Sequence, residues 1–510
     1  MSLLKQNIIA NFGGKACTAL LSLVLVPLYI KFMGIEAYGL VGIFSSLEVF
    51  SNLFDMGMST TLNRELARLS VMPDKAHEMR CMVRTMEVIY WSIAIFVGLA
   101  VVSLAGPIAR YWIKGVDLSP VAVQQAIMIM GGVIAFRWPL SFYSGGLHGL
   151  QKQVLLNGID ITAAILRGLG AILILWRISP TIQTFFTWQA FAGMIYSFTM
   201  AVFLWRNLPK SGHRPRFQKE SLRRIWRFAA GMTGISVTAI ILTQMDKIVL
   251  SKVLPLKMFG YYTLATVSAS MLCRFIGPVF EAVFPRFSQL VSLHDQDGLK
   301  ELYHKSCQFM SVMILPAALV VSLFSSELLL LWTGNPEAVA NTHRILSVLI
   351  IGTAINGLMD LPYALQLAHA WTKLVLYTNI IASLVLVPAI YFLASYYSAI
   401  GAASAWVILN VSYVLVIIQI MHSRLLKGEQ WRWFIQDVGM PLLAALVIAL
   451  FWRIFTPDGL LKYTMCIYLA CVSVTTLFAS ALCTPCTRFW IVQRVTRLKV
   501  YHRGVSIAGK

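Results

Sequence analysis

The chain has 510 residues, of which 58% are hydrophobic and only 12% are charged, and its mean hydropathy is +0.73. These values exclude a soluble globular protein and indicate a polytopic membrane protein. The formal net charge of +21 requires no nucleic-acid partner, because most of the cationic residues lie in segments between apolar ones.

A membrane-spanning helix requires roughly 20 mainly apolar residues, and the sequence contains about fourteen such segments. The predicted spans are residues 7–32, 37–62, 86–106, 121–143, 155–176, 183–206, 228–250, 258–284, 307–332, 345–368, 372–394, 398–421, 438–455 and 463–484. The predicted fold is therefore an all-α polytopic membrane protein.

The charges of the loops predict the orientation, since cytoplasmic loops are enriched in Lys and Arg. With the N-terminus inside, 28 of the 42 Lys and Arg residues fall on the cytoplasmic side and 9 on the other. Both termini are therefore expected in the cytoplasm. The first apolar segment is expected to remain as a span, because Lys15 interrupts it and no signal-peptide cleavage site follows.

An internal repeat organises the chain. The segment "YGLVGIFSSLEVFSNLFDMGMSTTLNRELARLS" from Tyr38 aligns with "FGYYTLATVSASMLCRFIGPVFEAVFPRFSQLVS" from Phe259, so that Gly39 matches Gly260 at an offset of 221. The offset equals six predicted spans, which gives both halves the same orientation. Parallel repeats of this kind are related by an axis along the membrane normal, and substrate sites lie at their interface.

The repeat predicts four regions. They are an N-lobe of six spans (1–206), a basic cytoplasmic linker (207–227), a C-lobe of six spans (228–421), and a C-terminal part with two further spans and a basic tail (422–510).

Polar residues recur at steps of three and four within several spans, which places them on one face of a helix. The second span carries Ser45, Glu48, Asn52, Asp55 and Ser59, and the eighth carries Ser270, Arg274, Gly277 and Glu281 at the corresponding positions. Further members are Asn11 and Lys15 in the first span, Asp160 and Arg167 in the fifth, Asp246 in the seventh, and Asn356 and Asp360 in the tenth. Arg137 lies beside Pro139 in the fourth span, where a local break in the helix is expected.

Each charge at the centre of a bilayer costs on the order of 2.5 to 3.5 kcal/mol on insertion scales, so these stripes are expected to line a hydrated cavity between the lobes. The predicted substrate-binding residues are Lys15, Arg137, Arg167, Arg274, Asn11 and Asn52. The predicted ion-coupling residues are Glu48, Asp55, Asp160, Asp246, Glu281 and Asp360. Arginine offers a permanent charge in a fork suited to phosphate oxygens, and carboxylates can bind and release protons.

Structural roles remain open for several of these charges. Lys15 can form a static ion pair with Glu48 or Asp55, Asp246 can extend toward the membrane surface beside Lys247, and Asp160 and Arg167 can pair with neighbouring helices.

No motif predicts a cofactor or a metal. "NFGGKACT" lacks the earlier glycine of a phosphate-binding loop. Cys483 and Cys486 form a lone CxxC without the second pair that a structural zinc site requires.

The opening "LLKQNIIANFGGKACTALLSLVLVPLYIKFMGIEAYGL" and its partial repetition "MDKIVLSKVLPLKMFGYYTLA" resemble the polysaccharide transport (Wzx-type) branch of the multidrug/oligosaccharidyl-lipid/polysaccharide (MOP, MATE-like) exporter superfamily. The resemblance covers roughly residues 1–420. It implies two six-helix lobes around a cationic cavity that opens alternately to each side of a bacterial inner membrane. The two surplus C-terminal spans resemble the extra helices that are thought to accommodate the lipid tail in related lipid II flippases, although the essential cavity arginines of those flippases do not map onto this chain.

The implied function is the flipping of a polyprenyl-diphosphate-linked oligosaccharide to the outer leaflet for a cell-surface polysaccharide such as O-antigen. The implied partners are that substrate, membrane lipids, H⁺ or Na⁺ as a coupling ion, and other membrane proteins of polysaccharide assembly. A cation-coupled drug antiporter of the same superfamily is the main alternative, and it would favour a more acidic cavity. A membrane glycosyltransferase or polymerase would need substantial outer loops, which the sequence lacks, so no enzymatic activity is expected.

Overall fold

The computed structural model describes residues 3–70, 72, 75–218, 237–457, 459, 461–485 and 488, excluding the side chains of residues 3–13, 15, 16 and 19. Within these residues, eleven helices are long and apolar enough to cross a membrane, and there is no β-structure apart from one isolated pairing of Lys114 with Pro255. The all-α polytopic class is confirmed, whereas the count of fourteen spans stays a prediction.

The chain divides into two compact units, Met1–Tyr261 and Tyr262–Lys510. The helical residues 237–253, which overlap the predicted seventh span, thus fall in the first unit. The predicted lobe boundaries stay a prediction.

The predicted linker 207–227 is described as far as residue 218. This part lies along α4 (Ala76–Pro107). The backbone N–H of Gln218 donates to the Thr85 hydroxyl at 2.9 Å, and Arg80 donates to the carbonyl of Pro209 at 3.1 Å. This part of the linker is therefore held against a helix of the first unit.

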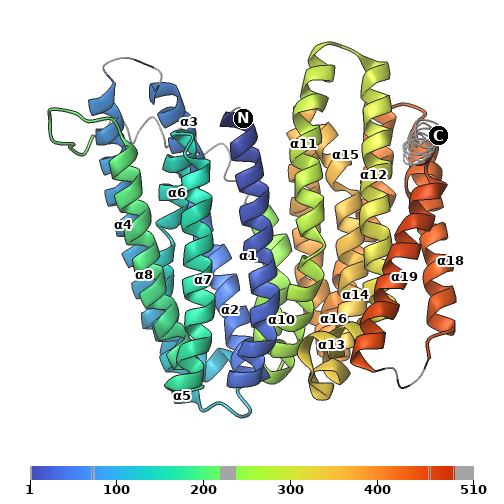
Figure 1. Ribbon diagram of the computed structural model, residues 1–510, viewed down its shortest axis with the longest axis horizontal. Coiled ribbons are helices and arrows are strands. Elements are labelled where there is room, and N and C mark those ends of the chain that lie inside the picture. The colour runs from blue at the N-terminus through green and yellow to red at the C-terminus, as the bar shows by residue number, and fades with distance from the viewer. Residues whose placement is uncertain are drawn as a thin grey trace, which may run out of the picture. The chain divides into compact units, whose positions relative to one another are not determined.

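The first unit is a bundle whose long helices pack side by side, with α1 against α7, α4 against α5, and α8 against both α5 and α7 (Figure 1). Its elements are α1 (Leu3–Met33), α2 (Ile35–Ser51), η1 (Asn52–Asp55), α3 (Met58–Ser70), α4 (Ala76–Pro107), η2 (Ile108–Trp112), α5 (Pro120–Arg137), α6 (Leu140–Gly149), α7 (Gln153–Arg177), α8 (Ile182–Asn207), residues 237–253 and the start of α10 (Leu256–Ser270).

Buried aromatic side chains join α4 to the junction of α5 and α6 in this bundle. The ring of Tyr90 stacks on Trp138 at 4.7 Å between centroids, and Phe142 packs against Tyr90 at 5.0 Å. All three side chains are buried. These side chains hold α5 and α6 at their junction. The predicted break beside Pro139 is confirmed, because α5 ends at Arg137 and α6 begins at Leu140.

The second predicted span is not one helix. The α-helix ends at Ser51, a 3₁₀ turn follows over Asn52–Asp55, and Met56 adopts left-handed backbone angles (φ 45°) before α3 begins at Met58. A non-glycine residue in this region carries a strain of order 1–3 kcal/mol, so the surrounding packing must hold it. The prediction of a single stripe from Ser45 to Ser59 is therefore wrong beyond Ser51.

The second unit is organised around α12, which packs against α11, α14, α18 and α19. Its elements are the rest of α10, α11 (Cys273–Ser292), α12 (Gln296–Leu323), α13 (Ser325–Thr333), α14 (Pro336–Leu358), α15 (Asp360–Ala368), α16 (Thr372–Leu425), α17 (Gln430–Arg432), η3 (Trp433–Gly439), α18 (Met440–Ile454) and α19 (Lys462–Cys483).

Breaks also divide predicted spans of this unit. The eighth span separates into α10 and α11 at Met271 and Leu272, so the predicted stripe from Ser270 to Glu281 does not lie on one helix. The tenth separates into α14 and α15 at Met359. The predicted spans 372–394 and 398–421 form the two parts of α16, which meet at the left-handed Ser398 (φ 57°).

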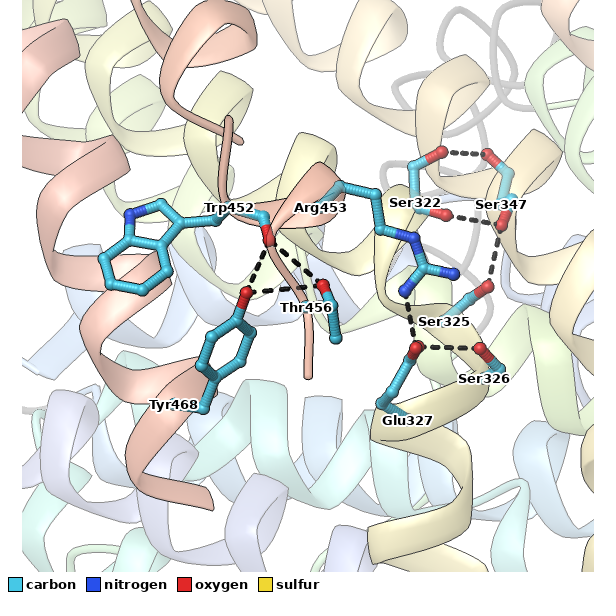
Figure 2. A network of polar contacts seen from close by, with 9 residues as sticks. All are labelled: Ser322, Ser325, Ser326, Glu327, Ser347, Trp452, Arg453, Thr456 and Tyr468. Carbon is cyan, nitrogen blue, oxygen red and sulfur yellow. Dashed lines mark hydrogen bonds and ion pairs between the residues drawn. The ribbon is translucent and has the colours of Figure 1, made fainter. Parts of the chain in front are cut away.

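The C-terminal helices α18 and α19 are tied to the second unit by a polar network (Figure 2). Arg453 of α18 donates to Glu327 of α13 at 2.5 Å and lies 5.3 Å from the ring centroid of Phe324. In α19, Tyr468 donates to the carbonyl of Trp452 at 2.5 Å. The two surplus spans are thus fixed parts of this unit.

The repeat identified in the sequence produces a helix crossing inside the first unit. Gly39 of α2 faces the carbonyl oxygen of Leu256, and Gly260 of α10 faces the carbonyl oxygen of Ile35. Ile35 and Leu256 are also 221 residues apart. Each glycine therefore faces the repeat equivalent of the residue that the other glycine faces, as in an isologous contact about a two-fold axis. A Cβ atom on Gly39 would lie 2.8 Å from the Leu256 oxygen.

We expect Gly39→Ala to lower the thermal unfolding temperature of the purified protein, because the methyl group must displace the Leu256 backbone, at a cost of about 1–3 kcal/mol. The matched control is Gly132→Ala in α5, where an added Cβ meets nothing within 4 Å. This variant should keep or raise the unfolding temperature, since alanine favours a helix by about 1 kcal/mol. Equal unfolding temperatures for the two variants would show that the crossing is loosely packed.

Candidate functional site

The first unit contains a cavity of about 310 Å³ between α1, α2, α5, α7 and α8. Among the residues whose side chains the structure describes, the charged ones that line it are Glu48, Arg137 and Arg167. Three of the predicted site residues, taken from three different spans, are thus brought together. The remaining wall combines aromatic rings with hydrogen-bonding groups, namely Tyr29, Tyr38, Phe44, Phe185, Ser45 and Gln189.

Glu48 and Arg137 form an ion pair across the cavity wall. Arg137 Nη2 lies 2.9 Å from Glu48 Oε1, and the two side chains are 19% and 31% exposed. The Arg137 guanidinium also lies 5.7 Å from the ring centroid of Phe44, within the range of a cation–π contact. Arg137 is the last residue of α5 before the break at Pro139, so the carbonyl end of the helix favours its positive charge.

Arg167 of α7 lines the same cavity without an ion-pair partner among the described residues. Its guanidinium lies 5.7 Å from the ring centroid of Tyr196, whose hydroxyl donates to Asp160 Oδ1 at 2.5 Å. Tyr196 thus contacts both the Arg167 guanidinium and the Asp160 carboxylate. This arrangement matches the prediction that Asp160 and Arg167 interact with neighbouring helices, since Tyr196 belongs to α8.

The two arginines also leave hydrogen-bonding capacity unused. In the described part of the molecule, the Nε–H groups of Arg137 and Arg167 are buried and have no hydrogen-bond acceptor. An unsatisfied buried donor costs about 1–3 kcal/mol. A ligand with several anionic oxygens would satisfy both donors at once.

Asp55 occupies a separate polar site beside the aromatic core. It accepts hydrogen bonds from Ser59 at 2.9 Å, from Ser141 at 3.4 Å, and from Tyr90. No cationic side chain pairs with it among the residues that the structure describes. The turn at Met56 explains why Glu48 and Asp55 have different partners, since the continuous helix that would align them is interrupted.

The other predicted site residues whose side chains are described do not line this cavity. In the second unit, Arg274 and Glu281 are exposed on α11, and Asp360 is half-buried at the start of α15, which packs against α11. No acidic side chain of the described residues lies within ion-pair distance of Arg274. In the first unit, Asn52 is exposed, and Asp246 lies 3.6 Å from Lys247. The side chains of Asn11 and Lys15 lie outside the described residues.

The sequence analysis missed a buried ionic cluster in the second unit. His304 of α12 lies 2.5 Å from Asp437 and 3.2 Å from Glu429, and Gln308 donates to Asp437 at 2.9 Å. Asp437 has 0% exposure and lies in the π-helical turn η3. Burial raises the pKa of Glu429, but His304, Lys300 and Arg432 outweigh it and leave the pKa below its ordinary value.

Two further buried carboxylates were also missed. Glu36 accepts hydrogen bonds from the backbone N–H groups of Val116 at 2.6 Å and Asp117 at 2.7 Å, and Glu87 accepts from Tyr143 at 3.0 Å and from Trp205. Glu36, Glu87 and Asp437 lie at the edges of predicted spans, where exposure to water is the default expectation, so the sequence carried no signal of their burial.

Comparisons with known proteins agree with this architecture. A family described as "Polysaccharide biosynthesis protein" matches residues 188–340. A putative O-antigen transporter of Shigella flexneri is 24% identical over 430 residues, which cover 83% of this chain and 99% of the relative. The lipopolysaccharide biosynthesis protein WzxC of Escherichia coli (strain K12) is 22% identical over 302 residues, which cover 58% of this chain and 59% of the relative.

Solved structures establish the fold. The lipid II flippase MurJ in an inward closed conformation superposes with a TM-score of 0.71 at 15% identity, covering 94% of this chain and 98% of the other. An inward-facing multidrug resistance MATE transporter of the MOP superfamily superposes with a TM-score of 0.64 at 14% identity, covering 80% and 94%. The predicted resemblance is confirmed: in sequence the chain is similar to a putative O-antigen transporter and to WzxC, and its fold is that of the MurJ and MATE proteins of the MOP superfamily.

Proposed function

We propose that this chain is an alternating-access flippase that moves a polyprenyl-diphosphate-linked oligosaccharide from the cytoplasmic to the outer leaflet of a bacterial inner membrane. The observation that carries the proposal is the cavity of the first unit, where two arginines face one carboxylate and both keep an unused Nε–H donor. The similarity to a protein named as a putative O-antigen transporter supports the class of substrate.

A diphosphate suits this cavity for physical reasons. Guanidinium groups bind phosphate oxygens through two parallel hydrogen bonds, and they keep their charge when desolvated. Arg137 is held by Glu48 at 2.9 Å and Arg167 by the face of Tyr196, so both cations are positioned before a ligand arrives. The aromatic and amide groups of the wall, such as Tyr29 and Gln189, are of the kind that contact sugars.

The Glu48–Arg137 pair offers a route to coupling. A diphosphate that takes over hydrogen bonds of Arg137 weakens its pairing with Glu48 and leaves that carboxylate available to a coupling cation. Substrate binding and ion binding would then be linked at one pair. The role of Asp55, Asp246, Glu281 and Asp360 as further ion-coupling groups, and of Arg274 as a substrate-binding group of the second unit, remains part of the proposal.

The charge of the cavity does not favour the antiporter of organic cations. Of the described side chains, two cations and one anion line it, whereas an organic cation requires the opposite balance. The likeness to MATE transporters concerns the fold. We also expect no enzymatic activity, and we expect both termini in the cytoplasm.

The double substitution Arg137→Met with Glu48→Leu tests whether the pair binds substrate or only holds α2 to α5. We expect Arg137→Met alone to lower both the yield of folded protein and transport, because it leaves a carboxylate without its cation. The double variant should regain the yield, since apolar residues of similar volume replace buried pairs well, but transport should stay absent. Flipping of a fluorescent polyprenyl-diphosphate sugar in proteoliposomes is the measurement. Normal flipping by the double variant would assign the pair a purely structural role.

Substitution of Arg167 tests the second cation. Loss of its charge-assisted hydrogen bonds, worth about 1.5–3 kcal/mol, should reduce the affinity for the diphosphate substrate by roughly 10- to 100-fold in Arg167→Gln. Arg167→Lys should recover only part of this, because an ammonium group cannot bind in a fork. The control is Arg177→Gln, at the last residue of α7 and outside the cavity. If Arg167→Gln binds the substrate as tightly as Arg177→Gln does, Arg167 does not contact the diphosphate.

A further inference from the structure

A second hollow lies in the first unit, on the seam between α7 and α8. This groove has a volume of about 520 Å³. Its lining is mainly aliphatic and aromatic, with Leu155, Ile159, Leu166, Ile195 and Phe203 among its residues. Both helices are membrane spans by length and composition, so the groove is expected at the depth of lipid hydrocarbon.

The groove and the cationic cavity share a wall. On α7, Leu166 lines the groove and the next residue, Arg167, lines the cavity. Likewise, Ala163 lines the groove and Ala164 lines the cavity. On α8, Tyr196 lines the groove while its ring lies 5.7 Å from the Arg167 guanidinium. A phosphate group at Arg167 and a hydrocarbon chain in the groove would therefore lie on either side of Tyr196.

We propose that the groove between α7 and α8 holds the first isoprene units of the substrate's polyprenyl tail. The inference rests on the proposed function and adds the place of the tail to it. In a lipid-linked diphosphate the hydrocarbon begins directly at the phosphate, so a tail site must adjoin the head-group site. The groove satisfies this condition through neighbouring residues of one helix.

The groove orients the tail more than it adds affinity. Lipid chains are as apolar as the lining, so no hydrophobic gain accompanies the transfer of a tail from the bilayer to the groove. The remaining contribution is van der Waals packing of the tail against fixed side chains, and it depends on the shape of the tail. A methyl-branched prenyl chain is thereby distinguished from the straight acyl chains around it. The two arginines beside the groove likewise favour a diphosphate over the single phosphate of an ordinary phospholipid.

This site differs from the C-terminal spans to which the family resemblance assigned the tail. Two apolar grooves do occur in the second unit, one of about 400 Å³ between the two parts of α16 and one of about 260 Å³ among α12, α14, α16 and the η3–α18 segment. Like the groove between α7 and α8, neither has a charged lining residue, but none of their lining residues is a chain neighbour of a residue that lines the cationic cavity. They are the alternative locations that the experiment must separate.

The test is photolabelling in proteoliposomes with a polyprenyl diphosphate that carries a diazirine on its first isoprene unit. Labelled peptides are mapped by mass spectrometry, and competition is measured with unlabelled polyprenyl diphosphate and with phosphatidylglycerol. We expect labels on the groove residues of α7 and α8, with competition by the diphosphate alone.

Two substitutions fill the groove without disturbing packing. An added Cβ at Gly158 meets nothing within 4 Å, and Thr162 is exposed on the groove wall. Gly158→Phe and Thr162→Phe should each reduce labelling of α7 and α8 roughly tenfold or more. The control is Leu173→Phe, at a residue of α7 that is 56% exposed and lines neither hollow, and its labelling should equal that of the unchanged protein.

The inference is overturned if labels map to the grooves of the second unit, if phosphatidylglycerol competes as well as the diphosphate, or if the filled variants are labelled normally. Flipping of the lipid-linked sugar, measured in parallel, separates this failure from that of the proposed function. Transport that persists without labelling of α7 and α8 removes only the tail site. Absence of both flipping and labelling anywhere removes the proposed function as well.

Discussion

A charged side chain inside a bilayer has no bulk water to satisfy it, and the first unit is arranged around this constraint. Each such charge costs on the order of 2.5 to 3.5 kcal/mol unless a partner offsets it. Glu48 and Arg137 offset each other, Asp55 is satisfied by hydroxyl groups, and Asp160 is satisfied by Tyr196. Among the described charges of the cavity, Arg167 has an aromatic face and no carboxylate partner, so these side chains carry an excess positive charge that an anionic ligand can neutralise.

Much of the architecture follows from sequence patterns that have a direct physical cause. Apolar length predicts most of the spans, Pro139 predicts the break between α5 and α6, and the match of Gly39 with Gly260 predicts equivalent positions that the structure places in contact. Arg137, Arg167 and Glu48 were each predicted to line a cavity between the two lobes, and the structure brings these three together in a cavity of the first unit.

Other features could not be predicted, for reasons that are equally physical. No proline marks the turn at Met56 in the sequence. A methionine at φ 45° must be held by the surrounding packing, which a single sequence does not show. The chain therefore directs Asp55 away from the helix face that Glu48 occupies. His304 and Asp437 are 133 residues apart, and each lies beside a predicted span where a solvated position is the ordinary expectation. Only the tertiary contact reveals that both are buried.

The polar groups described above differ between the two units in how they are satisfied. In the second unit, the polar network at Glu327 ties α18 to α13 (Figure 2). The network at Asp437 ties η3 to α12. Such networks favour a rigid body, because breaking one contact leaves a buried group without a partner. In the first unit, two guanidinium groups keep an unused donor on a cavity wall. An unsatisfied donor destabilises the empty protein, and a ligand that accepts its hydrogen bond removes this cost. The residues that would bind the ligand are therefore also residues at which binding can favour one conformation over another. A transporter needs this property, since a ligand shifts a conformational equilibrium only by the difference in its affinity for the two states.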